Sequence, residues 1–220
     1  SCMEAQILLY PLNIDLTGRL VVVVGGGAVA ERKVNGLLCT STDVLVRVVA
    51  PEATHALQQH AEMGRIDWKR VRYTREMLSG AFLVFAATDV RAVNTAAAAD
   101  ARAMGMLVNV ADDALGSTFQ VPSCVRRGDL LLTVSTGGAS PALSRRLRME
   151  LEQCYPPAFG IWLERVGKLR MQMQQELLSS RERTAFWRAA MRADVLDMVR
   201  NGELEKAEVE LRNAALGVGA

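Results

Sequence analysis

The sequence predicts an α/β fold with a parallel sheet, followed by a helical module. Short runs of β-branched residues alternate with helical stretches from Leu20 to Val110. Strand signals end near Pro141, after which apolar residues recur at helical spacing. The 220 residues are 50% hydrophobic and 23% charged, which is typical of a globular protein with room for one or two domains.

The predicted strands of the first part are Leu20–Val24, Val44–Val49, Phe82–Ala87 and Leu107–Val110, and Ala28–Leu38 between the first two has helical spacing. Strands that are apolar along their whole length are typical of a parallel sheet, because helices cover both of its faces. We therefore expect an α/β domain over residues 3–113.

Residues 114–150 form a predicted middle segment. Two apolar runs, Thr118–Val121 and Leu130–Ser135, flank the turn-like Arg127-Gly128-Asp129. They are too close together for a helical crossover, so they should pair as a hairpin or exchange with a partner chain. We expect this segment to be a linker or a dimerisation unit.

The last part, residues 151–220, is a predicted helical domain. The helical pattern already begins at Ser140, a candidate N-cap, and Pro141, at the first helical position. Three apolar stripes at helical spacing follow: Leu143, Leu147, Leu151 and Cys154; then Phe159, Trp162, Leu163, Val166, Leu169 and Met173; then Phe186, Trp187, Ala190 and Met191.

Composition excludes several classes of protein. A net charge of +2 argues against general nucleic-acid binding. The longest apolar runs, Leu20–Val24 and Phe82–Ala87, are far shorter than the roughly 20 residues of a membrane-spanning helix. No secretory signal pattern is present, so we expect a cytoplasmic protein. The cysteines are scattered without a CxxC pair, which indicates neither a metal site nor a disulfide framework.

The strongest local motif is Gly25-Gly26-Gly27-Ala28-Val29-Ala30, which directly follows the first strand and opens a helix. It fits G-x-G-x-x-A: Gly25 permits a tight turn, Gly27 lets the backbone approach a pyrophosphate, and Ala30 keeps the helix close to the strand. The N–H groups at the helix start favour an anion. In this context the motif predicts a dinucleotide-binding Rossmann domain, although a merely tight turn remains the alternative.

Two further strand ends carry candidate cofactor-binding residues. An acidic residue that binds the ribose hydroxyls is expected about 20 positions after the glycine motif. Here it comes later than that, at Glu52, and follows Pro51. No basic cluster follows this strand to receive a 2′-phosphate, which favours NAD over NADP. Thr88 and Asp89 end the third predicted strand and are either cofactor contacts or a helix N-cap.

Asp112 follows the last strand of the first domain, where a nicotinamide should project. A carboxylate there can take or deliver a proton during hydride transfer, and the alternative is a carboxylate that caps a turn. The two histidines, His55 and His60, fall on a predicted helix and form no catalytic pattern.

The middle segment carries the surplus of positive charge. Residues 123–150 contain five arginines and two acidic residues, and the arginines are Arg126, Arg127, Arg145, Arg146 and Arg148. Arginine suits bidentate binding of carboxylates, but a solvated helix face explains these residues equally well. Before that helix, Thr136 and Gly137 lie in a loop that is either a second anion site or a plain tight connection.

In combination, these stretches resemble the precorrin-2 dehydrogenase and sirohydrochlorin ferrochelatase family, the N-terminal module of siroheme synthases. The matching motifs run in order along nearly the whole chain: Tyr10-Pro11-Leu12, Gly25 to Lys33 (which includes Glu31-Arg32-Lys33), Val48 to Glu52, Ala86 to Asp89, Asn109 to Asp112, Phe119 to Pro122, Ser135 to Pro141, and Phe186-Trp187. The combination is specific where each motif alone is not.

The resemblance implies a homodimer with an NAD-binding Rossmann domain, a strand-exchanging dimerisation segment and a helical C-terminal domain. It implies oxidation of precorrin-2 to sirohydrochlorin with NAD and, in bifunctional members, Fe(II) insertion to give siroheme. Asp112 takes the role of the family's general base. Ala28, Val29, Pro51 and Glu52 match its cofactor-binding positions. Substrate-binding roles fall to Thr136, Gly137, Arg145 and Arg146.

Two other functions stay open at this point. One is an NAD-dependent dehydrogenase of another anionic substrate, and the other is a non-catalytic sensor that responds to NAD. The sequence leaves open chelatase activity and the choice between iron and cobalt, because the same proton acceptor would serve each.

Overall fold

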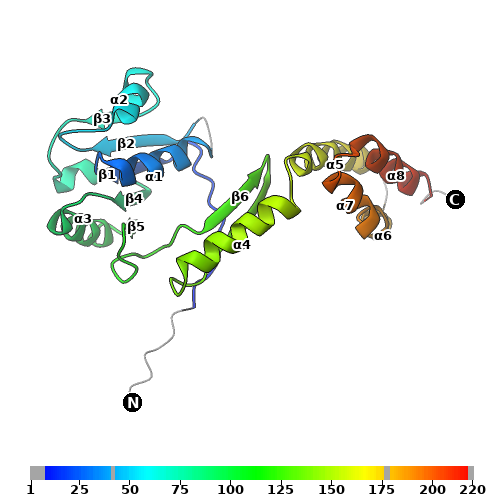
Figure 1. The fold of residues 1–220 in the computed structure, drawn as a ribbon. Helices are drawn as coiled ribbons and strands as arrows, with labels where there is room; N and C mark the ends of the chain where they lie inside the picture. The colour runs from blue at the N-terminus through cyan, green and yellow to red at the C-terminus, as the bar shows by residue number, and fades with distance from the viewer. Residues whose placement is uncertain (1–7, 41–42, 176–178, 218–220) are drawn as a thin grey trace, which may run out of the picture. The chain divides into compact units, whose positions relative to one another are not determined.

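The computed structural model describes residues 8–40, 43–175 and 179–217. The chain forms two compact units, Ser1–Val121 and Pro122–Ala220, whose elements are labelled in Figure 1. The predicted start of the first domain, at residue 3, lies outside the described residues. The finer division at residues 113 and 150 stays a prediction.

The first unit contains a parallel sheet of five strands: β1 (Leu20–Val24), β2 (Leu45–Val49), β3 (Asp67–Lys69), β4 (Leu83–Ala86) and β5 (Leu107–Val110). The strand order is β3-β2-β1-β4-β5, and every pair is parallel. This confirms the predicted α/β class and four predicted strands. β3 is an additional edge strand that the sequence pattern did not indicate.

Helices cover both faces of this sheet (Figure 1). They are α1 (Ala28–Leu38), α2 (His55–Glu62) and α3 (Arg91–Ala103), with a 3₁₀ helix, η1, at Arg75–Leu78. Val21 and Val23 of β1 pack into the core beneath α1 and α2. Val22 and Val24 pack into the core beneath α3, because successive side chains of a strand point to opposite faces. His55 and His60 lie on α2, as expected.

The second unit begins with an antiparallel hairpin of β6 (Ser123–Arg127) and β7 (Leu130–Val134). Gly128, at the first central position of its turn, has a φ of +58°, the region that a type II′ turn requires there. The prediction of a strand at Thr118–Val121 is wrong. Thr118 instead bonds back to β5, with its N–H donating to the carbonyl oxygen of Val108 at 2.8 Å, so the pairing strand starts after Pro122.

Five helices follow: α4 (Pro141–Cys154), α5 (Ala158–Gln175), α6 (Ser180–Ala190), α7 (Ala193–Arg200) and α8 (Leu204–Gly217). The Ser140 hydroxyl caps α4 by accepting a hydrogen bond from Leu143 N–H at 3.1 Å, which confirms the predicted helix start. The core of α5 to α8 includes Phe159, Trp162 and Phe186. Among the described residues no helix combines the length and apolarity needed to cross a bilayer.

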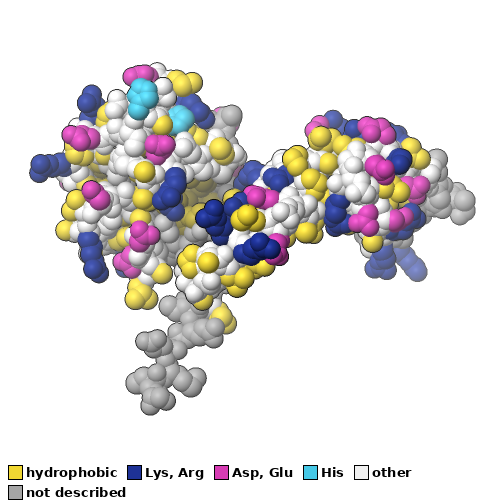
Figure 2. All heavy atoms as spheres, in the orientation of Figure 1, with side chains coloured by type: hydrophobic (Ala, Val, Ile, Leu, Met, Phe, Trp, Pro, Cys, Tyr) yellow, Lys and Arg dark blue, Asp and Glu magenta, His cyan; other side chains and the backbone are white. Residues whose placement is uncertain are grey.

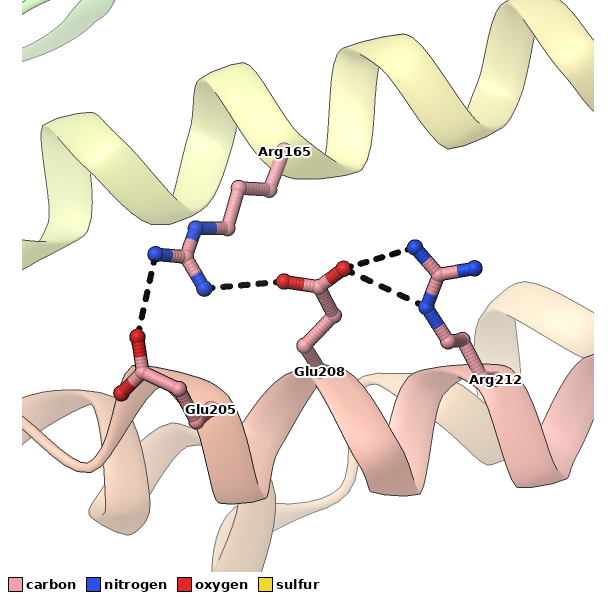
Figure 3. Close-up of polar contacts among 4 residues, drawn as sticks. All are labelled: Arg165, Glu205, Glu208 and Arg212. Atoms are coloured by element: carbon pink, nitrogen blue, oxygen red, sulfur yellow. Dashed lines mark hydrogen bonds and ion pairs between the residues drawn. The ribbon is translucent and has the colours of Figure 1, made fainter.

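An ionic network links α5 to α8 on the surface (Figure 3). Arg165 contacts Glu208 at 2.8 Å and Glu205 at 3.4 Å, and Arg212 donates to Glu208 at 2.8 Å. The hydrogen bonds from Arg212, and then from Arg165, lower the pKa of Glu208 below its ordinary 4.5. Exposed pairs of this kind contribute roughly 0 to 1 kcal/mol each, so buried apolar contacts dominate the stability of this unit.

Candidate active site

The candidate site lies at the carboxyl edge of the parallel sheet. β1 ends in register with both of its neighbours, since Val24 pairs with Val49 and with Ala86, and Ala86 pairs with Val110. The loops that follow these strands therefore emerge at one edge. They carry the glycine loop, Pro51-Glu52, Thr88-Asp89 and Asp112, which are the segments predicted to form a cofactor and catalytic site.

The three glycines of the glycine loop differ in whether the fold leaves room for a side chain. Gly25 has a φ of +132°, and a Cβ added there would collide with the carbonyl group of Ala87. A Cβ on Gly26 would collide with the carbonyl oxygen of Glu52. A Cβ on Gly27 would meet nothing within 4 Å. Packing of the chain thus requires the first two glycines, whereas the space beside Gly27 is open.

This open space lies at the start of α1. Gly27 is the N-cap, and the first helical bond runs from Glu31 N–H to its carbonyl oxygen at 2.9 Å. The N–H groups of Ala28, Val29 and Ala30 precede that bond, so they have no acceptor within the helix. Together with the helix dipole they favour the binding of an anion. The open space and the free donors fit the pyrophosphate of a dinucleotide.

The loop after β2 is hydrogen-bonded to the glycine loop. Thr54 N–H donates to the carbonyl oxygen of Gly26 at 2.9 Å. Pro51 and Glu52 lie exposed in this loop, beside the glycine loop, and their contact with a cofactor stays a prediction. Arg47 of β2 donates to the carbonyl oxygens of Met77 and Ser79 at 3.1 and 3.3 Å, so its guanidinium is already engaged in the fold.

Thr88 is held by Asn94, a residue that the sequence pattern did not indicate. The Asn94 side chain accepts from Thr88 N–H at 3.0 Å and donates to the Thr88 carbonyl oxygen at 2.9 Å. Asn94 is 7% exposed, and its only sequence signal is an amide in an otherwise alanine-rich helix. The N-cap of α3 is Val90, whose N–H bonds to the Thr88 hydroxyl at 3.1 Å. Asp89 is exposed.

Asp112 has an unusual backbone conformation. Its φ of +57° is the one positive value among the described residues other than glycine. Such a conformation costs roughly 1–3 kcal/mol and persists only where the surroundings enforce it. Here the Ser117 hydroxyl accepts from Val110 N–H at 2.8 Å and donates to the Asp113 carbonyl oxygen at 2.7 Å, which fixes the chain on both sides of Asp112.

The neighbouring aspartate takes the structural role. Asp113 Oδ1 accepts from Gly116 N–H at 2.8 Å and so caps the turn, and Arg102 holds the Gly116 carbonyl oxygen at 2.7 Å. Asp112 is exposed, and within the described part of the chain its carboxylate has no hydrogen bond. The turn-capping role considered for Asp112 therefore belongs to Asp113, and the carboxylate of Asp112 remains free to react.

Family comparisons match nearly the whole chain in three consecutive stretches. Residues 12–123 match a model described as NAD(P)-binding, residues 127–153 match the central part of sirohaem biosynthesis proteins, and residues 158–214 match the sirohaem synthase dimerisation region. The chain belongs to the family of this NAD(P)-binding model, and the rest of it matches the central and dimerisation regions of siroheme synthases. Its first unit is accordingly an NAD(P)-binding domain, which agrees with the open helix start at Gly27.

Individual relatives agree with this family. The siroheme synthase of Photorhabdus laumondii is 39% identical over 91% of this chain and 42% of its own length. That of Nitrosococcus oceani is 35% identical over 94% of this chain and 44% of its own length. This chain thus spans less than half of these relatives. A solved structure, SirC, precorrin-2 dehydrogenase, superposes with a TM-score of 0.74 at 26% identity, over 96% of this chain and 99% of SirC.

The predicted substrate-binding residues lie in the unit that matches the central and dimerisation regions of siroheme synthases. Thr136 has a local structural role, since its hydroxyl accepts from Ser140 N–H at 3.1 Å and bonds to Ser144 Oγ at 3.1 Å. Gly137 has a φ of +61° and open space beside it. Their contact with a substrate stays a prediction.

The five arginines of residues 123–150 differ in whether their side chains have a partner within the chain. Arg127 donates to the carbonyl oxygen of Tyr155 at 2.8 Å, Arg146 pairs with Glu150 at 2.9 Å, and Arg148 pairs with Glu152. The side chains of Arg126 and Arg145 are exposed and make no hydrogen bond or ion pair within the described residues. Along α4 the basic side chains lie next to exposed apolar ones (Figure 2), among them Leu143 and Leu147, which are 49% and 37% exposed. The first predicted apolar stripe is therefore not part of this unit's core.

Proposed function

We propose that this protein oxidises precorrin-2 to sirohydrochlorin, with NAD as the hydride acceptor. One observation carries the proposal: a free carboxylate, Asp112, lies at the same sheet edge as a glycine loop whose open helix start fits a pyrophosphate. The printed names of the relatives supply the substrate class, because SirC is a precorrin-2 dehydrogenase and the sequence relatives are siroheme synthases.

The chain's own residues divide the reaction between them. Oxidation removes one hydride and one proton from the substrate, and a bound nicotinamide supplies the hydride acceptor. Asp112 takes the proton on its carboxylate. The enforced backbone of Asp112 fixes the direction in which its side chain leaves the chain, so less conformational freedom is lost when the carboxylate meets the substrate. Ala28 and Val29 bind the pyrophosphate through their N–H groups, and Thr88 and Asp89 flank the cofactor.

The choice of NAD over NADP is part of the proposal. Glu52 is an exposed carboxylate beside the glycine loop and would repel a 2′-phosphate. The basic groups of the nearby strands are engaged, since Arg47 bonds to backbone carbonyls, Lys69 pairs with Asp67 at 3.0 Å, and Arg70 lies over the Trp68 ring. NAD should therefore bind more tightly than NADP.

We also propose a homodimer. The exposed leucines of α4 form an apolar stripe that a second copy would bury, and residues 158–214 match a region described as a dimerisation region. The exposed Arg145, with Arg146, Thr136 and Gly137, would meet the carboxylates of the tetrapyrrole. A cytoplasmic location fits the free and exposed thiols of Cys39, Cys124 and Cys154, because thiols persist in a reducing compartment.

The experiment is an anaerobic assay of the purified protein with precorrin-2 and NAD, followed by the absorbance of NADH and of sirohydrochlorin. Equal amounts of both products support the proposal. Added Fe(II), and then Co(II), decide whether the same protein also inserts a metal faster than the uncatalysed reaction. If the protein binds NAD but oxidises no substrate, the result favours the hypothesis of a non-catalytic NAD-responsive sensor. If it oxidises a different anionic substrate, the result favours the other dehydrogenase hypothesis.

A further inference from the structure

Lys33 lies on α1 and extends over the ring of Phe85 on the sheet face that α1 covers. Its ammonium nitrogen is 5.5 Å from the centroid of the Phe85 ring. Phe85, of β4, is 5% exposed and packs edge-on against Phe119 with a centroid distance of 5.5 Å and an interplanar angle of 78°. On this part of the face a loop around Phe119 packs on the strands instead of a helix. Lys33 thus reaches past its own helix toward β4 and β5.

The groups beneath Lys33 connect it to Asp112. Phe85 pairs in register with Asn109 of β5, and Asn109 Nδ2 donates to the Phe119 carbonyl oxygen at 3.1 Å. Asp112 follows three residues after Asn109, in the turn that comes directly after the same strand. The two aromatic rings beneath the ammonium group are therefore joined through Asn109 to the strand that leads to Asp112.

The charge of Lys33 is only partly compensated. The side chain is half-buried, and no carboxylate lies within 4 Å of its nitrogen in the part of the chain that the structure describes. Burial, and then the positive charge of Arg32, lower the pKa of Lys33, while the more distant Asp112 carboxylate raises it. A partly desolvated ammonium without a close anion is costly, and a ligand carboxylate would remove that cost.

The position expected for the cofactor's phosphates is distant from the Lys33 ammonium group. The open helix start is at Gly27, six residues before Lys33 or about 9 Å along the helix axis. The Lys33 nitrogen lies over Phe85 of β4, the strand that pairs with β5, which leads to Asp112. We propose that Lys33 is a substrate-binding residue whose ammonium group receives a carboxylate of the substrate beside Asp112. This inference rests on the proposed function, which supplies a substrate with carboxylate groups.

Three variants of the 220-residue chain test it: Lys33→Met, Lys33→Arg and, as a matched control, Lys69→Met on β3. Met keeps the apolar stem over Phe85 but removes the charge, so we expect the KM for precorrin-2 to rise about tenfold with the KM for NAD within about twofold of wild type. Lys33→Arg should restore most of the loss, and Lys69→Met should match wild type. Thermal unfolding of each variant reports folding separately.

The outcomes separate this inference from the proposed function. Wild-type protein that does not oxidise precorrin-2 would overturn both. An active wild type whose Lys33→Met variant keeps the KM for precorrin-2, or raises the KM for both ligands equally, would overturn the inference alone. A lower melting temperature with unchanged kinetics would assign Lys33 the structural role of covering Phe85 and would likewise overturn it.

Discussion

At the scale of single residues, three adjacent glycines illustrate how much a motif can predict. The G-x-G-x-x-A pattern indicated Gly25 and Gly27 and treated Gly26 as variable. The structure requires glycine at position 26, because the carbonyl oxygen of Glu52 occupies the place of its Cβ. That contact joins two loops distant in sequence, so no local pattern could indicate it. Three consecutive glycines were its only signal.

Two glycine variants should therefore behave in opposite ways. Gly27→Ala adds a methyl group to open space, so we expect a melting temperature within about 3 °C of wild type but at least tenfold weaker NAD binding, because the methyl fills the pyrophosphate position. Gly26→Ala should instead destabilise the domain, because the added methyl collides with backbone.

Calorimetric titration with NAD and thermal unfolding of both variants measure these effects. Unchanged NAD affinity in a folded Gly27→Ala variant would contradict the position assigned to the pyrophosphate.

Asp112 marks the limit of prediction for a single residue. Its place after β5 follows from the sequence, but its left-handed backbone does not. That conformation depends on Ser117 and on the turn capped by Asp113. No role for Lys33 followed from the sequence, although this residue belongs to the motif from Gly25 to Lys33. Its position over Phe85 depends on the packing of α1 on the sheet, which no local pattern indicates.

At the scale of elements, the buried strands were predictable and the exposed ones were not. β1, β2, β4 and β5 are apolar runs within the core, and the sequence indicates each within one residue at either end. β3 is a three-residue edge strand of Asp, Trp and Lys, which is too short and polar to give a pattern. The first strand of the hairpin was predicted too early, at Thr118–Val121, because that run is more apolar than β6, whose one buried residue is Val125. In the structure Thr118 bonds to Val108 of β5 instead.

Two glycines of α5 offer a matched test of how the hairpin packs on this helix. A Cβ on Gly160 would lie 2.9 Å from the backbone of Arg127, whereas a Cβ on Gly167 would meet nothing within 4 Å. We expect Gly160→Ala to destabilise the protein by about 1–3 kcal/mol through this overpacking. Gly167→Ala should stabilise it by about 0.5–1 kcal/mol, because alanine favours the helix.

Urea unfolding of the two variants gives both free energies. Equal effects would mean that the hairpin turn is not packed closely on α5.

At the scale of the whole molecule, assembly should depend on the second unit. Its helical core is complete around Phe186 and Trp162, yet the α4 leucines remain exposed. The sequence indicated this stripe by its spacing, but spacing cannot tell a core within the chain from an interface between chains. An exposed apolar stripe next to arginines is what a dimer with an anionic ligand would use.

Introducing charge on this stripe should separate the subunits. We expect the double variant Leu143→Lys and Leu147→Lys to sediment as a monomer where wild type sediments as a dimer, because two buried ammonium groups without partners are costly. Leu45→Lys makes the same change at a leucine that is 55% exposed in the first unit and should leave the dimer intact. A double variant that stays dimeric would exclude α4 from the interface.

The central claim is that Asp112 takes the proton when the substrate is oxidised. The most direct measurement compares Asp112→Asn with Asp113→Asn in anaerobic turnover of precorrin-2 with NAD, alongside the dissociation constant for NAD. We predict that Asp112→Asn binds NAD normally and loses at least a hundredfold in kcat, in the range typical of a general base. Asp113→Asn should stay active, because an amide oxygen can still accept from Gly116 N–H. Full turnover by Asp112→Asn would contradict the account.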